Sequence, residues 1–150
     1  MVMMMLPVDY TSDDYRFNKT LHMDVEILPD EWNNKWDLQF SNGDFKMLTG
    51  KDSLRNAINI AIMTRYQELK NELYTNFGCK IHELLKANKS IVVQKKIQYY
   101  CENVLNEMRR IKRVNEIIVT DNKDDNTHKY GVFFNITSIN DEIISGSVKL

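Results

Sequence analysis

The side chains best suited to bind a metal lie around residue 80. Cys79 and His82 are three positions apart, so on a helix both would lie on one face and could form half of a zinc site. Zinc usually takes four ligands, and Cys101, His22 and His128 have no spacing that completes the set. We therefore favour a buried thiol and a surface imidazole, and we expect no metal and no cofactor.

A group of aspartates offers a second kind of ligand. Asp121, Asp124 and Asp125 carry the oxygen atoms that calcium prefers. Their spacing lacks the glycine and the closing glutamate of an EF-hand loop. A solvated loop is the expected structure here.

The densest basic cluster consists of Arg109, Arg110, Lys112 and Arg113. It could bind phosphate, which would make the chain a small nucleic-acid-binding module. No aromatic platform for bases is evident beside it, and 20 basic against 21 acidic side chains create no overall attractive field. We place the cluster near the end of a helix, where cations favour the helix dipole, and expect it to bind carboxylates.

Bulk properties indicate one soluble domain without an enzyme motif. The five glycines are scattered, so there is no phosphate-binding loop and no nucleophile elbow. A hydrophobic content of 43% in 150 residues suffices for a core without disulfides. The apolar start, residues 1–6, lacks the basic flank and the length of a signal peptide, and no apolar run is long enough to span a bilayer. We expect assembly in a reducing cytoplasm.

The elements that must position these residues begin with a β-hairpin. Apolar residues alternate with polar ones over residues 36–40, and Asn42-Gly43 then provides the strongest short turn signal. The polar segment before the hairpin has only short strand-like stretches. We therefore divide the chain into an N-terminal arm, residues 1–34, and a domain, residues 35–150.

Three helices should follow the hairpin. Thr49 or Asp52 can cap the first, a short second helix should run from Cys79 to Leu85, and a third should start near Ser90. Apolar residues recur every three or four positions in the first and third helices. The stripe of the first is Leu54, Ala57, Ile58, Ala61, Ile62 and Tyr66, and that of the third is Ile97, Tyr100, Cys101, Val104, Leu105, Met108 and Ile111.

Three strands should end the chain. Residues 116–120, 130–139 and 142–150 are rich in β-branched residues, and the polar segment 121–129 separates the first two. Helices and antiparallel strands are thus segregated along the sequence. This order predicts the α+β class.

Residues 36–150 resemble the protein W-like baseplate wedge family of contractile tails. The resemblance rests on motifs in the family's order and spacing. These are Asn42-Gly43-Asp44-Phe45, Gly50, Leu54, Ala57-Ile58, Thr64-Arg65-Tyr66-Gln67-Glu68-Leu69, Phe77-Gly78, Arg110-Ile111 and Val114. The chain departs from the pattern where Gln67 replaces a glycine, where Thr75 replaces a proline, and where Met108-Arg109-Arg110 replaces the Glu-Pro-Arg of some branches.

The resemblance implies a structural subunit of the tail baseplate, found in the virion and made in the host cytoplasm. Such subunits join a helical core bundle with other wedge proteins, and their terminal sheet copies the sheath subunit's handshake domain. The first sheath ring can then exchange strands with that sheet, and the tail tube or hub could be a further neighbour. The expected wedge-core contacts are Thr64, Glu68, Phe77, Gly78 and Arg110. The expected sheath-contact strands carry Ile143, Ile144, Val148 and Leu150.

Two alternatives stay open beside the structural role. Glu68 could act as the general acid of a peptidoglycan-cleaving, lysozyme-like enzyme, but glycoside hydrolysis ordinarily needs a second carboxylate, and none is evident. A carboxylate bonded to loop amides is the favoured interpretation of Glu68. The other alternative is the nucleic-acid-binding module described above. We expect no catalytic residue.

Overall fold

The computed structural model describes residues 13–29, 36–70, 76–121 and 130–150. A three-stranded sheet forms the body, and its strands are β7 (Ile111–Asp121), β8 (Tyr130–Ser138) and β9 (Ile143–Lys149). The order is β7-β8-β9 and both pairings are antiparallel. The predicted terminal strands are thus confirmed, although β7 begins five residues before the predicted start at residue 116.

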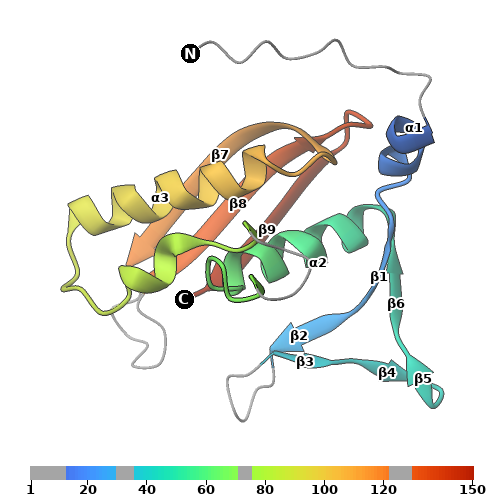
Figure 1. Ribbon diagram of the computed structural model, residues 1–150, viewed down its shortest axis with the longest axis horizontal. Helices are drawn as coiled ribbons and strands as arrows, with labels where there is room; N and C mark the ends of the chain where they lie inside the picture. The colour runs from blue at the N-terminus through green and yellow to red at the C-terminus, as the bar shows by residue number, and fades with distance from the viewer. Residues whose placement is uncertain (1–12, 30–35, 71–75, 122–129) are drawn as a thin grey trace.

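Alternation along β8 makes one face of this sheet the core face. Tyr130, Val132, Phe134 and Ile136 are buried, and the residues between them are more exposed. Two helices, α2 (Gly50–Met63) and α3 (Ile91–Asn106), lie across that face (Figure 1). Helix α3 packs mainly on β7, and α2 packs on β9.

Both helices bury the stripes that the sequence predicts. Leu54, Ile58 and Ile62 of α2 are fully buried, as are Ile97 and Leu105 of α3. The start of α3 is also as predicted, because the Ser90 hydroxyl accepts a hydrogen bond from the Val93 amide at 3.2 Å. The mixed helix and antiparallel-strand architecture agrees with the α+β class.

Three predicted helix limits are corrected. Tyr66 lies beyond α2, whose last turn closes when the Thr64 amide donates to the Ile60 carbonyl. The second helix is a single 3-10 turn, η1 (Lys80–Glu83). Ile111 belongs to β7, because the chain after α3 pairs with β8 instead of extending the helix. Helical spacing of apolar residues therefore continued past the real end of α3.

The N-terminal segment contains α1 (Asp13–Lys19), β1 (Met23–Val25) and β2 (Ile27–Pro29). Leu21, which follows α1, is 1% exposed and belongs to the hydrophobic core. The side-chain amide of Asn56 on α2 donates to the Val25 carbonyl at 3.0 Å. Residues 13–29 thus pack on the body, and the division of the chain at residue 34 stays a prediction.

The predicted hairpin is split into four short strands. These are β3 (Trp36–Leu38), β4 (Phe40–Ser41), β5 (Asp44–Phe45) and β6 (Met47–Thr49). Strands β4 and β5 pair across the Asn42-Gly43 turn, where both residues have positive φ, so the predicted turn is confirmed. The flanking strands pair with the N-terminal segment instead of with each other, as β2 with β3 and β1 with β6 (Figure 1).

A ring of backbone hydrogen bonds joins these three strand pairs. The Glu26 amide donates to Lys46, the Lys46 amide to Gln39, and the Gln39 amide to Glu26, at 2.8 to 2.9 Å. The Lys46 ammonium also contacts the Glu26 carboxylate at 2.7 Å. The junction satisfies every backbone group that the split would otherwise leave unpaired at these residues.

Candidate functional site

The outer edge of β9 is the first candidate contact surface. Tyr130 and Leu150 exchange both backbone hydrogen bonds, at 3.2 and 2.8 Å between nitrogen and oxygen. Because antiparallel partners alternate between bonded and non-bonded pairs, the same inward bonding recurs at Val148, Gly146 and Ile144. The N–H and C=O groups of the intervening residues point away from β8. These residues are Ile143, Ser145, Ser147 and Lys149.

The register of β9 is regular over its whole length. Among the strands that the structure describes, β9 pairs with β8 alone. An edge of this kind can accept a strand from another chain through main-chain hydrogen bonds.

Side chains of β9 divide between the core and the surface. Of the four expected sheath-contact residues, Ile144, Val148 and Leu150 are buried under the helices, and Ile143 alone is exposed, at 66%. A partner strand would therefore meet the backbone of β9 and the side chain of Ile143. The three buried side chains hold the edge in place from behind.

Arg55 of α2 reaches this edge. Its Nε donates to the Ser145 carbonyl at 2.9 Å, and its guanidinium also contacts the Asp52 carboxylate at 2.9 Å. One of the outward carbonyls is thus already bonded within the chain. This contact could not be predicted from local sequence patterns, because Arg55 and Ser145 are 90 positions apart.

The packing at Gly146 is a second feature that was not predicted from the sequence. A Cβ atom at this position would lie 2.5 Å from Cζ of the buried Phe134 ring. The absence of a side chain lets that ring pack against β9. A glycine inside a β-branched strand was the available signal.

The other edge of the sheet is β7, and it is irregular. Its pairing with β8 shifts twice, between Ile111 and Arg113 and between Val114 and Glu116, so that Lys112 and Asn115 are extra residues. Lys112 contacts the Asp141 carboxylate at 2.5 Å. Bulges and charges of this kind discourage the addition of a further strand.

Four of the five expected wedge-core residues lie close together in a hydrogen-bonded loop region after α2, which we call the α2 loop cluster. Thr64 caps α2 and its carbonyl accepts the Cys79 amide at 2.9 Å, while the Phe77 carbonyl accepts the Gln67 amide at 3.0 Å. The Glu68 carboxylate accepts the Arg65 amide at 3.1 Å. This last bond agrees with the interpretation of Glu68 as a carboxylate held by a loop amide.

Gly78 allows the two backbone segments of the α2 loop cluster to approach each other closely. Its φ is +109°, and a Cβ atom would lie 2.4 Å from the Arg65 carbonyl oxygen. The close approach accompanies a parallel bridge between Arg65 and Cys79. Positive φ and close backbone approach therefore both require glycine at this position.

Arg110 lies apart from these four residues. Its guanidinium donates to the Leu21 carbonyl at 3.0 Å, and burial lowers its pKa although the charge of Asp24 acts in the opposite direction. The basic cluster lies near the end of α3, as predicted, but in the turn after the helix and in the first residues of β7. Arg113 donates to the Asn115 side chain at 3.0 Å.

The residues weighed as metal ligands are placed differently from one another. The thiols of Cys79 and Cys101 hydrogen-bond to each other, which lowers the pKa of Cys79 and raises the pKa of Cys101. Burial lowers the pKa of His82, and the nearby charge of Arg65 lowers it further. In the described part of the chain, no three His, Cys, Asp or Glu side chains form a group that could hold a metal. Asp124, Asp125, His128 and Thr75 lie outside the described residues.

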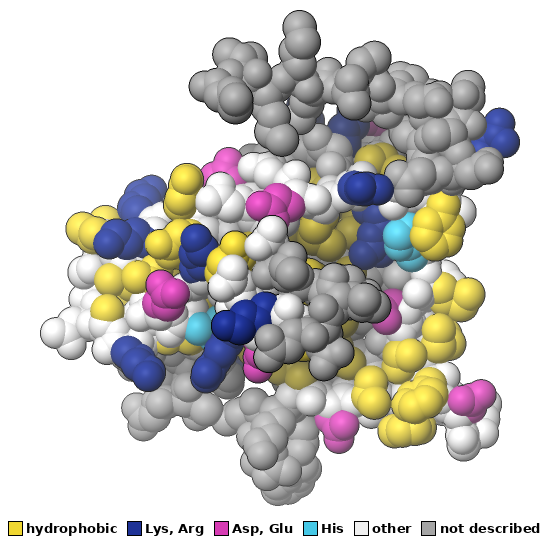
Figure 2. Space-filling view, viewed as in Figure 1, with side chains coloured by type: hydrophobic (Ala, Val, Ile, Leu, Met, Phe, Trp, Pro, Cys, Tyr) yellow, Lys and Arg dark blue, Asp and Glu magenta, His cyan; other side chains and the backbone are white. Residues whose placement is uncertain are grey.

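Hydrophobic side chains also gather on the strand pairs beside the body. Figure 2 shows them over β2 to β6, at the lower right of the view. Phe40 and Phe45 stack with their ring centroids 5.0 Å apart and remain 64% and 46% exposed. None of the described helices is long and apolar enough to cross a membrane.

Comparison with known proteins identifies the family. Residues 30–141 match the model of the contractile injection system sheath initiators. The match runs from the segment before β3 to the turn after β8, and β9 follows it. No curated protein matches the chain. Since the family model covers well over half of the 150 residues, the chain belongs to the contractile injection system sheath initiator family.

Proposed function

We propose that this protein starts the tail sheath of a contractile injection system by offering β9 to a strand of the first sheath ring. Membership of the sheath initiator family supports a structural role in beginning sheath assembly. The observation that carries the proposal is the regular edge of β9, with its outward backbone groups at Ile143, Ser147 and Lys149. Strand addition would satisfy those groups through the partner's main chain.

The three-stranded sheet would serve in this role as a handshake-like domain. Its core face is anchored by α2 and α3, so the incoming strand would meet a rigid edge. A rigid template keeps the ordering cost of binding on the incoming strand alone. The first sheath ring would then inherit its register from β9.

A second part of the proposal concerns the protein W-like wedge role. The α2 loop cluster of Thr64, Glu68, Phe77 and Gly78 would face other wedge proteins in the baseplate. Arg110 would hold the N-terminal segment against the body. Residues 35–150 would form the wedge domain, with residues 1–34 contributing a further contact. The protein would then belong to the baseplate of the virion, after assembly in the host cytoplasm.

We also propose that the protein works without a catalytic step. One oxygen of the Glu68 carboxylate accepts a hydrogen bond from the Arg65 amide, which supports a structural use of this acid. A general acid in glycoside hydrolysis would instead need its proton free for the substrate. The side chain of glutamine can accept the same hydrogen bond from the Arg65 amide. Replacing Glu68 by Gln should therefore leave sheath assembly and infection efficiency close to normal.

The direct test is assembly without the protein. Tails assembled in its absence should have tubes and baseplates but no ordered sheath, as seen by negative-stain electron microscopy. Purified protein added back should restore sheaths of normal length. Normal sheaths in its absence would contradict the proposal.

A further inference from the structure

The first part of α3 exposes large apolar side chains to solvent. Ile91, Val92 and Tyr99 are 75%, 64% and 61% exposed. The buried stripe through Ile97 and Leu105 already faces the sheet, so these three side chains form a second apolar stripe on the other side.

The second stripe lines a shallow groove. Its volume is about 500 Å³, and its lining residues are Ile91, Val92, Lys95, Lys96, Tyr99 and Tyr100. Residues 91, 95 and 99 follow one another at spacings of four, as do residues 92, 96 and 100, so the groove runs along the helix axis. Ten residues of helix span about 14 Å. The groove thus offers between two and three turns to a partner.

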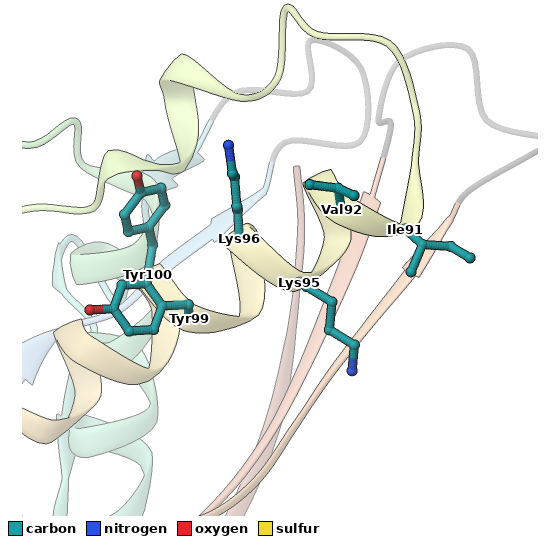
Figure 3. A pocket seen from close by; sticks show the side chains of 6 residues that line it. All are labelled: Ile91, Val92, Lys95, Lys96, Tyr99 and Tyr100. Carbon is teal, nitrogen blue, oxygen red and sulfur yellow. The ribbon is translucent and has the colours of Figure 1, made fainter.

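Two ammonium groups border the apolar stripe. Figure 3 shows Lys95 and Lys96 extending in opposite directions from α3, between the aliphatic pair and the tyrosines. In the part of the chain that the structure describes, neither takes part in an ion pair, whereas Lys46, Lys89 and Lys112 each contact a carboxylate. Figure 2 shows the same mixture of hydrophobic and basic side chains at the left of the view, over this end of α3.

We propose that this face of α3 binds an acidic amphipathic helix of another protein. An apolar seam two to three turns long, with a cation on each side, is the geometry that one helix offers to another in a coiled-coil-like contact. The partner would place aliphatic side chains between Ile91 and Tyr99, and carboxylates beside Lys95 and Lys96. Charges at the margin of an interface contribute more to the choice of partner than to the binding affinity.

The proposal goes beyond the sheath contact and does not depend on it. The groove lies on α3, which packs on β7, whereas the sheath edge is β9 at the opposite side of the sheet. A variant can therefore lose one contact and keep the other. Sheath assembly and helix binding are separate measurements.

The test uses the whole purified chain and two synthetic peptides. Both are helical peptides of about 18 residues with the same leucine stripe, and they carry either Glu or Lys at the positions beside it. Fluorescence anisotropy should show the Glu peptide binding at least about tenfold more tightly than the Lys peptide. The double variant K95E/K96E should reverse that preference.

Two further variants separate this outcome from general effects. K51E/K86E makes the same change of net charge at exposed lysines outside the groove, and should keep the preference for the Glu peptide. Val92→Ser should weaken binding of the Glu peptide about tenfold, while circular dichroism stays unchanged because Val92 is exposed. Equal binding of both peptides, no binding up to about 1 mM, or a preference that K95E/K96E leaves unchanged would overturn the proposal.

Discussion

The two edge strands of the terminal sheet, β7 and β9, differ in their regularity: β7 is irregular and β9 is regular. β7 has two bulges, at which Lys112 and Asn115 are the extra residues. β9 has an unbroken register and outward backbone groups at every second residue. Proteins commonly protect an edge with bulges and charges. β9 has no bulge and carries one charged residue, Lys149 at its end, which indicates an edge kept for a partner.

Two features of β9 stabilise this open edge in the absence of a partner. Arg55 occupies the Ser145 carbonyl in the middle of β9, which shortens the run of free outward groups. Gly146 lets the Phe134 ring pack tightly behind the strand. One edge is thus irregular, and the other is partly covered by the Arg55 side chain.

The largest effect is expected from Ser147→Pro. Proline removes the outward N–H of Ser147, and it is tolerated on edge strands because that N–H bonds to nothing in β8. Circular dichroism should show a folded chain, and electron microscopy should show tails without ordered sheath. Ser147→Ala keeps the N–H and should assemble normally. Normal sheaths on tails with Ser147→Pro would show that β9 does not bind the sheath strand.

Gly146→Ala should lower stability by about 1–3 kcal/mol, because the new methyl group would collide with the buried Phe134 ring. The free energy of unfolding from urea titration measures this effect. Ser147→Ala, whose side chain is exposed, should stay within about 0.5 kcal/mol of the wild type. An unchanged midpoint for Gly146→Ala would mean that β9 is not held by this packing.

Arg55→Ala should expose the Ser145 carbonyl and speed the addition of the first sheath strand. One hydrogen bond contributes on the order of 1 kcal/mol, which corresponds to roughly a fivefold change in rate. Light scattering can follow sheath assembly on purified baseplates. Asp52→Ala removes the ion pair of Arg55 but keeps its bond to Ser145, and should change the rate less. A slower rate for Arg55→Ala would show that Arg55 helps to bind the strand.

The smallest effect concerns the ion pair that ties the bulged residue Lys112 to the turn before β9. The hydrogen bond and the charge of Lys112 lower the pKa of Asp141 below its ordinary value of 3.8. The stabilisation is therefore present above pH 3.8 and is lost as the pH falls through the lower pKa of the folded state. Asp141→Asn should be slightly less stable than the wild type at pH 7, by urea titration. A difference that persists at pH 2 would point to another cause.

Local patterns in the sequence predicted much of this fold. Alternation and β-branching located β8 and β9, Ser90 located the start of α3, and Asn42-Gly43 located the turn between β4 and β5. These features depend on neighbours in the chain. The pairing of residues 23–29 with β3 and β6 depends on distant contacts, so the sequence alone suggested one continuous hairpin.

The candidate site was harder to predict for a physical reason. The sequence predicted sheath-contact strands that carry Ile144, Val148 and Leu150, and in the structure these three side chains lie in the core. Which backbone groups point outward follows from the bonding of Tyr130 to Leu150, and no residue type encodes that choice. Glu68 was easier to predict, because its carboxylate bonds to the amide of Arg65, only three residues away.

Cryo-electron microscopy of assembled tails tests the central claim most directly. The map should show a strand of the first sheath ring beside β9, with its backbone bonded to Ser147 and Lys149 and with Arg55 moved from Ser145. A sheath strand paired with β7, or a first ring that contacts neither edge, would contradict the account.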